Sequence, residues 1–292
     1  MPSTRDIRRR IKSVKNTAQI TKAMQMVASS KMRRAQLAAL AGRPYAALLN
    51  QVLGDVAAEN VGFNHPLMEE RTGSRRCVIL VSTDKGLCGA LNSNLTREAA
   101  KFDKDTTVFI CAGKKGAQFV TRTKRKLAME FTYKDAPLFA EARAISRYAQ
   151  ELFLTGEVDS VEILFTNFVS TLVQKPQQVP FLPVGELKGV AAGMQSHQNR
   201  AELEKSGLEY QFEPDAEHVL GDLLPHALNF QVYQILLEAK ASEHSSRMVA
   251  MKNATDNAKQ LIKDLTLEYN KLRQANITKE LLEITTAQMA LG

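Results

Sequence analysis

Glycine and proline are missing from long segments at both ends of this chain. Neither residue occurs from Ser3 to Ala41, and neither occurs from His226 to Leu291. Because glycine and proline are the residues that most weaken or break helices, both segments are predicted to be long helices. The second would be a rod of roughly 100 Å at ~1.5 Å per residue. A globule of this mass is only about half as wide, so such a rod has to pack on a partner.

The apolar residues of the two segments indicate that they pair with each other. In each segment the candidate seam positions alternate by four and three, which is the spacing of a coiled coil. In the first segment these positions are Ile7, Ile11, Val14, Ala18, Thr21, Gln25, Ala28, Met32, Ala35 and Ala39, and in the second they are Met251, Ala254, Ala258, Leu261, Leu265, Glu268, Leu272 and Ala275. We therefore expect an antiparallel coiled coil of the two ends of the chain.

Sequence signals also mark where each helix begins. Ser3 and Asp6 have the spacing of a capping box at the start of the first helix. Asp222 could cap the second helix, with Pro225 in its first turn, where a missing N–H has no partner to lose. Pro44 is expected to kink the first helix unless the kink is tolerated.

Acidic residues are almost absent from the first 43 positions. This segment has eleven lysines and arginines and a single acid, Asp6, so the whole net charge of +8 comes from it. Such a density of cations indicates an acidic surface alongside, whether phosphate, anionic lipid or a carboxylate-rich protein. A second basic tract from Lys114 to Lys126 is as easily explained by a solvated face.

Cysteines are few, and apolar runs are short. Cys77, Cys88 and Cys111 are odd in number and show no CxxC spacing, so a disulfide framework is not expected. The N-terminus is charged where a signal peptide would be apolar, and no segment approaches the ~18 apolar residues of a membrane span. The sequence therefore predicts a chain that stays in the cytosol.

The middle of the chain has the pattern of an α/β domain. Short β-branched runs at 77–82, 108–112 and 161–165 read as buried strands, and helix-compatible segments at 94–102 and 139–153 lie between them. This alternation predicts a mainly parallel sheet. The proline-rich segment 175–184 could be an edge strand, 62–76 is expected to be a linker, and 185–207 a mobile surface excursion.

Catalytic and metal-binding motifs are absent. The segment from Asp84 to Asn92 places Gly86 and Gly89 before a helix, but neither GxxxxGK[ST] nor GxGxxG occurs, so tight turns are favoured over nucleotide binding. Gly113 to Gly116 is a still weaker candidate. The five histidines have no HExxH spacing, and Cys88 has no histidine beside it in sequence. We expect no cofactor, no metal and no catalytic residue.

Three segments carry a resemblance to a known family. Ile7 to Arg33, Gly86 to Asn92, and Ala241 to Lys252 followed by Tyr269 to Glu283 resemble the gamma subunit of the F-type ATP synthase, in the family's order and spacing. The chain differs in having Ala90 where the family usually has a second glycine. It also lacks the chloroplast-type dithiol insertion, which favours a bacterial protein.

The resemblance implies a fold and a domain division. It implies an antiparallel coiled coil of the N- and C-terminal helices with a Rossmann-like α/β domain inserted between them. The coiled-coil shaft would comprise residues 1–61 and 214–292, and the α/β domain residues 62–213.

The resemblance also implies partners and a site. The shaft would stand, in one copy, inside the hexameric ring of alpha and beta subunits, while the α/β domain would rest on the epsilon subunit and the c-subunit ring. The chain would be peripheral, at the cytoplasmic face of the bacterial inner membrane, and would contact the membrane only through the c ring. The positions implied to face the catalytic ring are Lys22, Met24, Arg247, Arg273, Gln274, Thr278 and Glu280.

Two other classes of protein share some of these features. A basic coiled coil could be a nucleic-acid-binding rod, but the basic helix lacks the interleaved aromatics of single-strand binders. A nucleotide-binding enzyme with helical arms is disfavoured by the missing phosphate loop.

Overall fold

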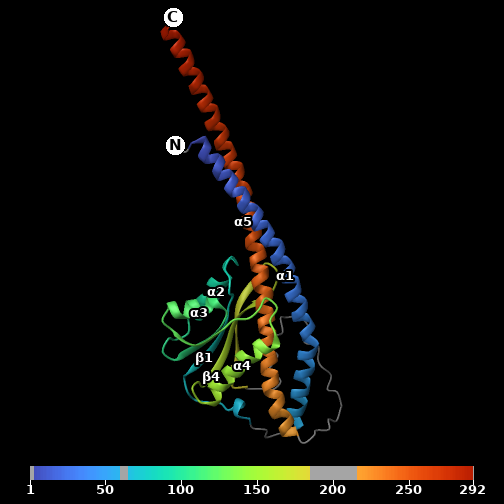
Figure 1. The fold of residues 1–292 in the computed structure, drawn as a ribbon. Helices are drawn as coiled ribbons and strands as arrows, with labels where there is room; N and C mark the ends of the chain where they lie inside the picture. The colour runs from blue at the N-terminus through green and yellow to red at the C-terminus, as the bar shows by residue number, and fades with distance from the viewer. Residues whose placement is uncertain (1–2, 60–64, 185–215, 292) are drawn as a thin grey trace. The chain divides into compact units, whose positions relative to one another are not determined.

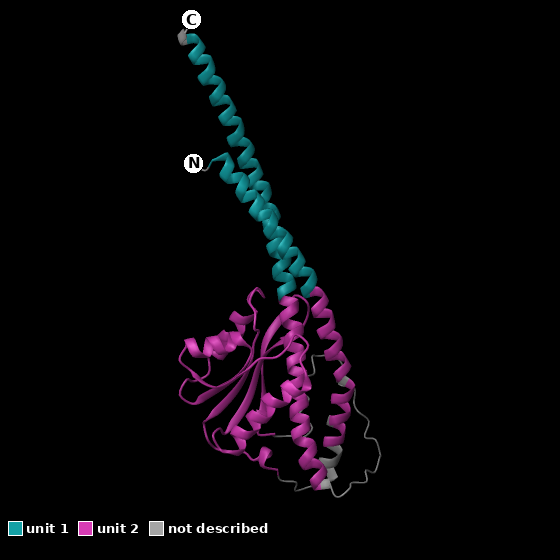
Figure 2. Ribbon diagram, in the orientation of Figure 1, with its two compact units in different colours: residues 1–28, 247–292 teal, residues 29–246 magenta. Residues whose placement is uncertain are grey.

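The computed structural model describes residues 3–59, 65–184 and 216–291, and these form two compact units. One unit comprises residues 1–28 and 247–292, and the other residues 29–246 (Figure 2). Two long helices, α1 (Thr4–Glu59) and α5 (Ala216–Leu291), contribute residues to both units. Between them the chain forms a sheet and shorter helices (Figure 1).

The larger unit contains a five-stranded sheet in the order β3-β2-β1-β4-β5. Its strands are β1 (Arg76–Val81), β2 (Thr107–Ala112), β3 (Lys126–Phe131), β4 (Ser160–Phe168) and β5 (Gln174–Leu182). The first four are parallel, and β5 pairs antiparallel with β4 at the edge. The connecting helices are α2 (Leu91–Ala99), α3 (Lys114–Arg122) and α4 (Phe139–Leu154), and a short 3-10 helix spans Pro66–Met68.

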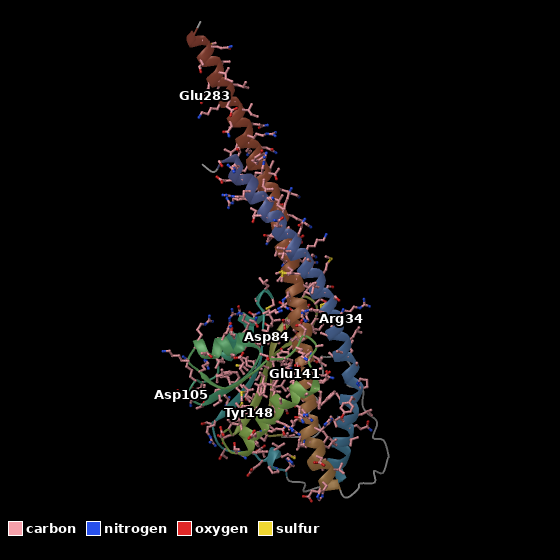
Figure 3. All side chains as sticks on the ribbon, viewed as in Figure 1. Arg34, Asp84, Asp105, Glu141, Tyr148 and Glu283 are labelled. Carbon is pink, nitrogen blue, oxygen red and sulfur yellow. The ribbon has the colours of Figure 1, made fainter. Side chains whose placement is uncertain are left out.

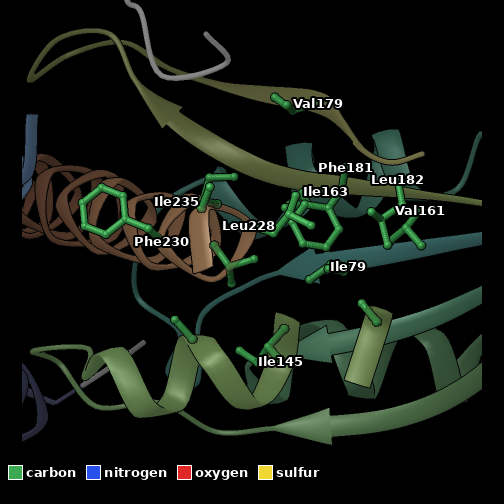
Figure 4. Close-up of a cluster of buried hydrophobic side chains, with 14 of the residues drawn as sticks. Ile79, Ile145, Val161, Ile163, Val179, Phe181, Leu182, Leu228, Phe230 and Ile235 are labelled. Carbon is green, nitrogen blue, oxygen red and sulfur yellow. The ribbon is translucent and has the colours of Figure 1, made fainter. Parts of the chain in front are cut away.

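Alternate residues of the central strands enter two separate cores. Val78, Leu80 and Phe109 pack with residues of α2 and α3 on one face of the sheet. On the opposite face, Ile79 and Ile163 pack with α4 and with the first half of α5 (Figure 4). Because both faces are covered, these strands are apolar throughout, which is why the sequence shows them as continuous β-branched runs.

The fold class is therefore confirmed, with differences in particular elements. The edge strand predicted at 175–184 is β5. The sequence predicts neither α3 nor β3, because their segment reads as a basic tract. The excursion expected at 185–207 lies outside the described residues.

The predicted start of the second helix was wrong. Asp222 and Pro225 lie inside α5, which begins at Ala216, so Asp222 is not its cap. By contrast, the capping box of α1 is present: the Asp6 amide donates to Ser3 Oγ (3.2 Å), and Ser3 Oγ donates to the Asp6 carboxylate (2.8 Å). α1 continues past Gly42 and Pro44 to Glu59.

Candidate functional site

In the smaller unit, α1 and α5 pair as an antiparallel coiled coil. Arg8 contacts Tyr269, and Thr21 contacts Thr255, so residue numbers rise on one helix as they fall on the other. The α1 seam is as predicted from Ile7 to Ala28. Every predicted position in that range is buried or half-buried, and most of the positions between them are exposed.

The predicted seam of α5 was only half right. The structure buries or half-buries Met251, Ala254, Ala258, Leu265 and Leu272, but it leaves the predicted positions Leu261, Glu268 and Ala275 exposed. The chain uses Thr255, Ile262 and Tyr269 instead. This choice continues the alternation of four and three. It half-buries Ile262 and Tyr269, whereas Leu261 and Glu268 stay exposed.

Two polar contacts fix the alignment of this coil. The hydroxyls of Thr21 and Thr255 lie 2.7 Å apart across the seam. Nearer the start of α1, Arg8 Nη2 donates to the Tyr269 hydroxyl (2.6 Å), and the guanidinium carbon lies 5.5 Å from the ring centroid. Sequence reasoning missed both pairs, because Thr255 and Tyr269 fall outside the phase that was chosen for α5.

The candidate residues fall into separate groups on this coil. Lys22 is exposed and Met24 half-buried on α1, next to the Thr21 contact with Thr255. Arg247 is half-buried and is the first residue of α5 that belongs to the smaller unit. Arg273 lies 18 residues beyond Thr255, which is about 27 Å along a helix. The structure does not gather the candidate residues into one cluster.

The remaining candidates lie on the last part of α5, where α1 gives no cover. Every described side chain from Arg273 to Met289 is exposed, including Gln274, Thr278 and Glu280, and side chains project from all sides of this segment (Figure 3). The Thr278 hydroxyl donates to the Gln274 carbonyl (3.0 Å). We call residues 273–291 the α5 tip.

The α5 tip exposes large apolar side chains, a type that is ordinarily buried away from water. Ile277, Leu281, Leu282 and Ile284 are 49–60% exposed, and Met289 is 85% exposed. Single exposed apolar residues are normal, but a run of them on one helix marks an interaction surface. The α5 tip therefore has the composition of a helix that is covered by another protein.

The α1 part of the coil carries the positive charge. Arg5, Arg8, Arg9, Arg10, Lys12, Lys15 and Lys22 are all exposed. Arg9 pairs with Asp6 at 3.1 Å, within one turn of the same helix. These cations are therefore exposed to solvent, and the acidic surface that the charge distribution indicates stays a prediction.

In the α/β domain, the polar groups of the two glycine-containing loops form hydrogen bonds with other atoms of the protein. At the start of α3, the amide of Lys114 donates to the Asp84 carboxylate, that of Lys115 to the Thr83 carbonyl, and that of Gly116 to Ser82 Oγ. These amides are the donors that a phosphate at this helix N-terminus would need.

The loop before α2 is held in the same way. The Asn92 amide donates to Thr83 Oγ1 (2.7 Å) and to Cys88 Sγ (3.3 Å). The Ser246 hydroxyl donates to the Cys88 carbonyl (2.6 Å). Gly89 adopts a positive φ of 58°, which glycine tolerates without strain. The loop is thus a set of tight turns fastened to α5.

The cysteines have no features of reactive thiols. All three are free and buried, and burial raises the pKa of Cys77 and Cys111 to about 12. The thiolate is the nucleophilic form, so Cys77 and Cys111 remain inert thiols at neutral pH. Within the described ranges, no group of three or more potential metal ligands occurs. None of the helices in these ranges combines the length and the hydropathy of a membrane span.

Comparison with known proteins identifies the family. The family model described as ATP synthase matches residues 3–291. A relative from Opitutus terrae, the ATP synthase gamma chain, is 48% identical over 99% of this chain and 99% of its own. A gamma chain from Herpetosiphon aurantiacus is 47% identical over the full length of both. The chain belongs to the ATP synthase gamma chain family.

Solved structures show the same fold as this gamma-chain family member. A chain of the Euglena gracilis mitochondrial ATP synthase, described as OSCP/F1/c-ring in rotational state 3, has a TM-score of 0.67 at 21% identity and covers 99% of this chain and 94% of that one. A chain from the Tetrahymena thermophila enzyme, described as central stalk/cring, has a TM-score of 0.61 at 23% identity, over 80% and 99% of the two chains.

The function class is that of the gamma-chain family, the rotor of the central stalk. The comparisons give no support to the nucleic-acid-binding alternative. Neither the comparisons nor the structure tests the ring-facing role of the seven candidate residues, which stays a prediction.

Proposed function

We propose that this chain couples ion flow to ATP synthesis as the asymmetric shaft of a rotary ATP synthase, and that it contributes no catalytic group of its own. The observation that carries this proposal is the α5 tip, an uncovered helix with exposed apolar side chains in a chain of the gamma-chain family. Catalysis would belong to the beta subunits.

Its partners would be those of the central stalk. One copy of the coiled coil would stand inside the hexameric ring of alpha and beta subunits. The α/β domain would bind the epsilon subunit and the c-subunit ring, through which alone the chain would reach the membrane. The chain would then be a peripheral component at the cytoplasmic face of a bacterial plasma membrane. The proposed division places the shaft at residues 1–61 and 214–292, and the α/β domain at 62–213.

Such a shaft acts by making different contacts at different angles. A ligand shifts a conformational equilibrium only as far as its affinities for the two states differ. Rotation of an asymmetric helix pair would present each beta subunit in turn with a different surface, and so drive it through open and closed states. The exposed cations of α1, including Lys22 beside Met24, would meet acidic beta-subunit loops.

The α5 tip would combine two kinds of contact with the ring. Apolar side chains such as Leu281 and Leu282 make non-directional contacts and would serve as a bearing. Arg273 and Gln274 would instead make directional hydrogen bonds, which for arginine are charge-assisted, and these would favour one beta conformation at one angle. Thr278, Glu280 and Arg247 would add polar contacts of the same kind.

This division of roles is tested by Arg273→Ala combined with Gln274→Ala in the assembled enzyme. Loss of about 1.4 kcal/mol at the rate-limiting angle lowers turnover about tenfold, so we expect ATP synthesis and hydrolysis to fall at least several-fold. Subunit stoichiometry should stay intact, because the coiled-coil seam and the α1 cations are unchanged.

The matched control is Asn270→Ala with Lys271→Ala, which also removes one amide and one cation from exposed positions of α5. We expect this control to retain most of the turnover. Wild-type rates per assembled complex in the Arg273 and Gln274 variant would show that torque passes elsewhere on the shaft.

A further inference from the structure

Both long helices reach the same carboxylate of the α/β domain. Asp135 lies in the loop between β3 and α4 and accepts a hydrogen bond from Lys31 of α1. Its carboxylate also lies 3.9 Å from Lys240 Nζ and 3.9 Å from His244 Nε2, both on α5. The hydrogen bond from Lys31, together with the nearby cations, holds the pKa of Asp135 below its ordinary value.

Lys240 is the buried member of this group. It is 2% exposed, and its ammonium donates to the Glu243 carboxylate at 3.0 Å. The same nitrogen lies 4.4 Å from the ring centroid of Tyr133, whose hydroxyl donates to the Ser82 carbonyl at the end of β1. Removing an ammonium from water costs several kcal/mol unless its partners are well placed. Lys240 is thus held by Glu243 on its own helix and by Tyr133 and Asp135 of the α/β domain.

Further polar contacts between α5 and the domain follow directly after Lys240, near the middle of the helix. Just after Lys240 and His244, Ser245 donates to the Thr171 carbonyl (2.8 Å), and Ser246 donates to the Cys88 carbonyl (2.6 Å). The earlier part of α5 instead packs on the sheet through apolar side chains such as Leu228 and Ile235 (Figure 4). Apolar packing is non-directional, whereas buried ionic and polar contacts can fix the register between elements.

We propose that Asp135, Lys31 and Lys240 form a lock that fixes the rotation of α1 and α5 against the α/β domain when torque passes between them. The proposal rests on the rotor function proposed above. The c ring would turn the α/β domain, and the coiled coil would drive the beta subunits through their conformations, so any slip between domain and helices would waste the rotation. The Asp135 carboxylate contacts Lys31 of α1 and Lys240 of α5, so it opposes rotation of both helices about their axes relative to the domain. Apolar contacts alone would permit that rotation.

The test compares hydrolysis by the assembled enzyme in sealed membrane vesicles with and without an uncoupler. In a tightly coupled motor the opposing ion gradient slows ATP hydrolysis, so the uncoupler stimulates it. Asp135→Asn should reduce this stimulation toward none, because a slipping joint lets hydrolysis proceed against the gradient. Lys31→Gln should reduce it in the same direction but less, since Lys240 remains. Asp135→Glu, which keeps the charge, should recover part of the stimulation.

The control is Glu98→Gln, which removes an exposed ion pair between α2 and Lys101 just after it and should leave the stimulation unchanged. Lys31 is 41% exposed, so its variant is expected to fold even if Asp135→Asn fails to assemble. Wild-type stimulation in assembled Lys31→Gln and Asp135→Asn complexes would overturn the lock. If the wild-type chain itself failed to restore ATP synthesis to a complex lacking its gamma subunit, the rotor function would be overturned instead.

Discussion

At the scale of single residues, the ionised carboxylate of Asp159 stabilises the α/β domain. Its carboxylate is 5% exposed and accepts three hydrogen bonds from Arg75, one from the amide (2.9 Å) and two from the guanidinium (3.1 and 2.8 Å). These hydrogen bonds and the arginine charge lower the pKa of Asp159. They tie the start of β1 to the start of β4.

The lowered pKa predicts a dependence of stability on pH. Because the folded-state pKa of Asp159 lies below its unfolded value, the stabilisation is complete at neutral pH. It is lost as the pH falls from about 4 through the folded-state pKa. Asp159→Asn should therefore lower the free energy of unfolding at neutral pH and reduce its further loss in acid. Urea titrations at several pH values measure both effects. Asp105→Asn is the control, at an exposed position of the same domain; an equal acid response in Asp159→Asn and wild type would contradict the assignment.

Gly42 is the residue that lets α1 approach α5 in the larger unit. A Cβ at this position would lie 1.7 Å from Gln234 Nε2, and Gln234 is buried. Alanine gains about 1 kcal/mol over glycine in helix propensity, but overpacking a core costs about 1–3 kcal/mol. We expect Gly42→Ala to lower the free energy of unfolding and Gly42→Ala with Gln234→Ala to recover it. Thermal unfolding of the two variants decides the point, and a stabilising single variant would show that the buried amide moves aside freely.

At the scale of elements, the α5 tip should behave differently alone and in its complex. It has no cover from α1, so in the isolated chain the amides of Gln274 to Met289 should exchange with solvent much faster than those around Leu265, which is buried in the seam. In the assembled enzyme the same amides should become protected. Hydrogen exchange with mass spectrometry measures both states. Equal protection of the tip and the Leu265 region in the isolated chain would mean that the tip needs no partner.

The sequence predicts the strands that are buried on both faces and misses the elements that are largely exposed. β1, β2 and β4 are buried on both faces, so their apolar runs identify them. β3 is an edge strand with mostly exposed side chains, and α3 buries only a narrow face, so both look like solvated basic sequence. The amphipathic pattern of α3 is the local signal that could have identified it as a helix.

The coiled coil shows a second limit of sequence reasoning. Leu261 and Ile262 are adjacent apolar residues, so either could start a heptad phase. The phase is decided by contacts distant in sequence, Thr255 with Thr21 and Tyr269 with Arg8. For the candidate site, the sequence alone predicts only a basic N-terminal helix and a C-terminal helix that is longer than it. The individual ring-facing positions came from the family resemblance, because exposed helix residues carry no local sign of what they contact.

At the scale of the whole molecule, the chain has the parts that a shaft requires. The α/β domain provides a folded body with two cores, and the long helices carry an exposed cationic stripe and an apolar tip. A chain that turns inside a ring needs contacts that keep it centred but do not prevent its rotation. Non-directional apolar contacts suit the bearing, and a small number of directional contacts suit the transmission of torque.

The central claim is that this chain rotates, and direct observation of rotation tests it. The catalytic ring of the assembled enzyme would be immobilised, and a probe would be attached through a cysteine introduced at exposed Asp105 of the α/β domain. On addition of ATP, the probe should rotate in one direction. A cross-link between the α5 tip and a beta subunit should stop both rotation and hydrolysis until it is cleaved. Sustained ATP hydrolysis by the same complexes with a stationary probe would contradict the account.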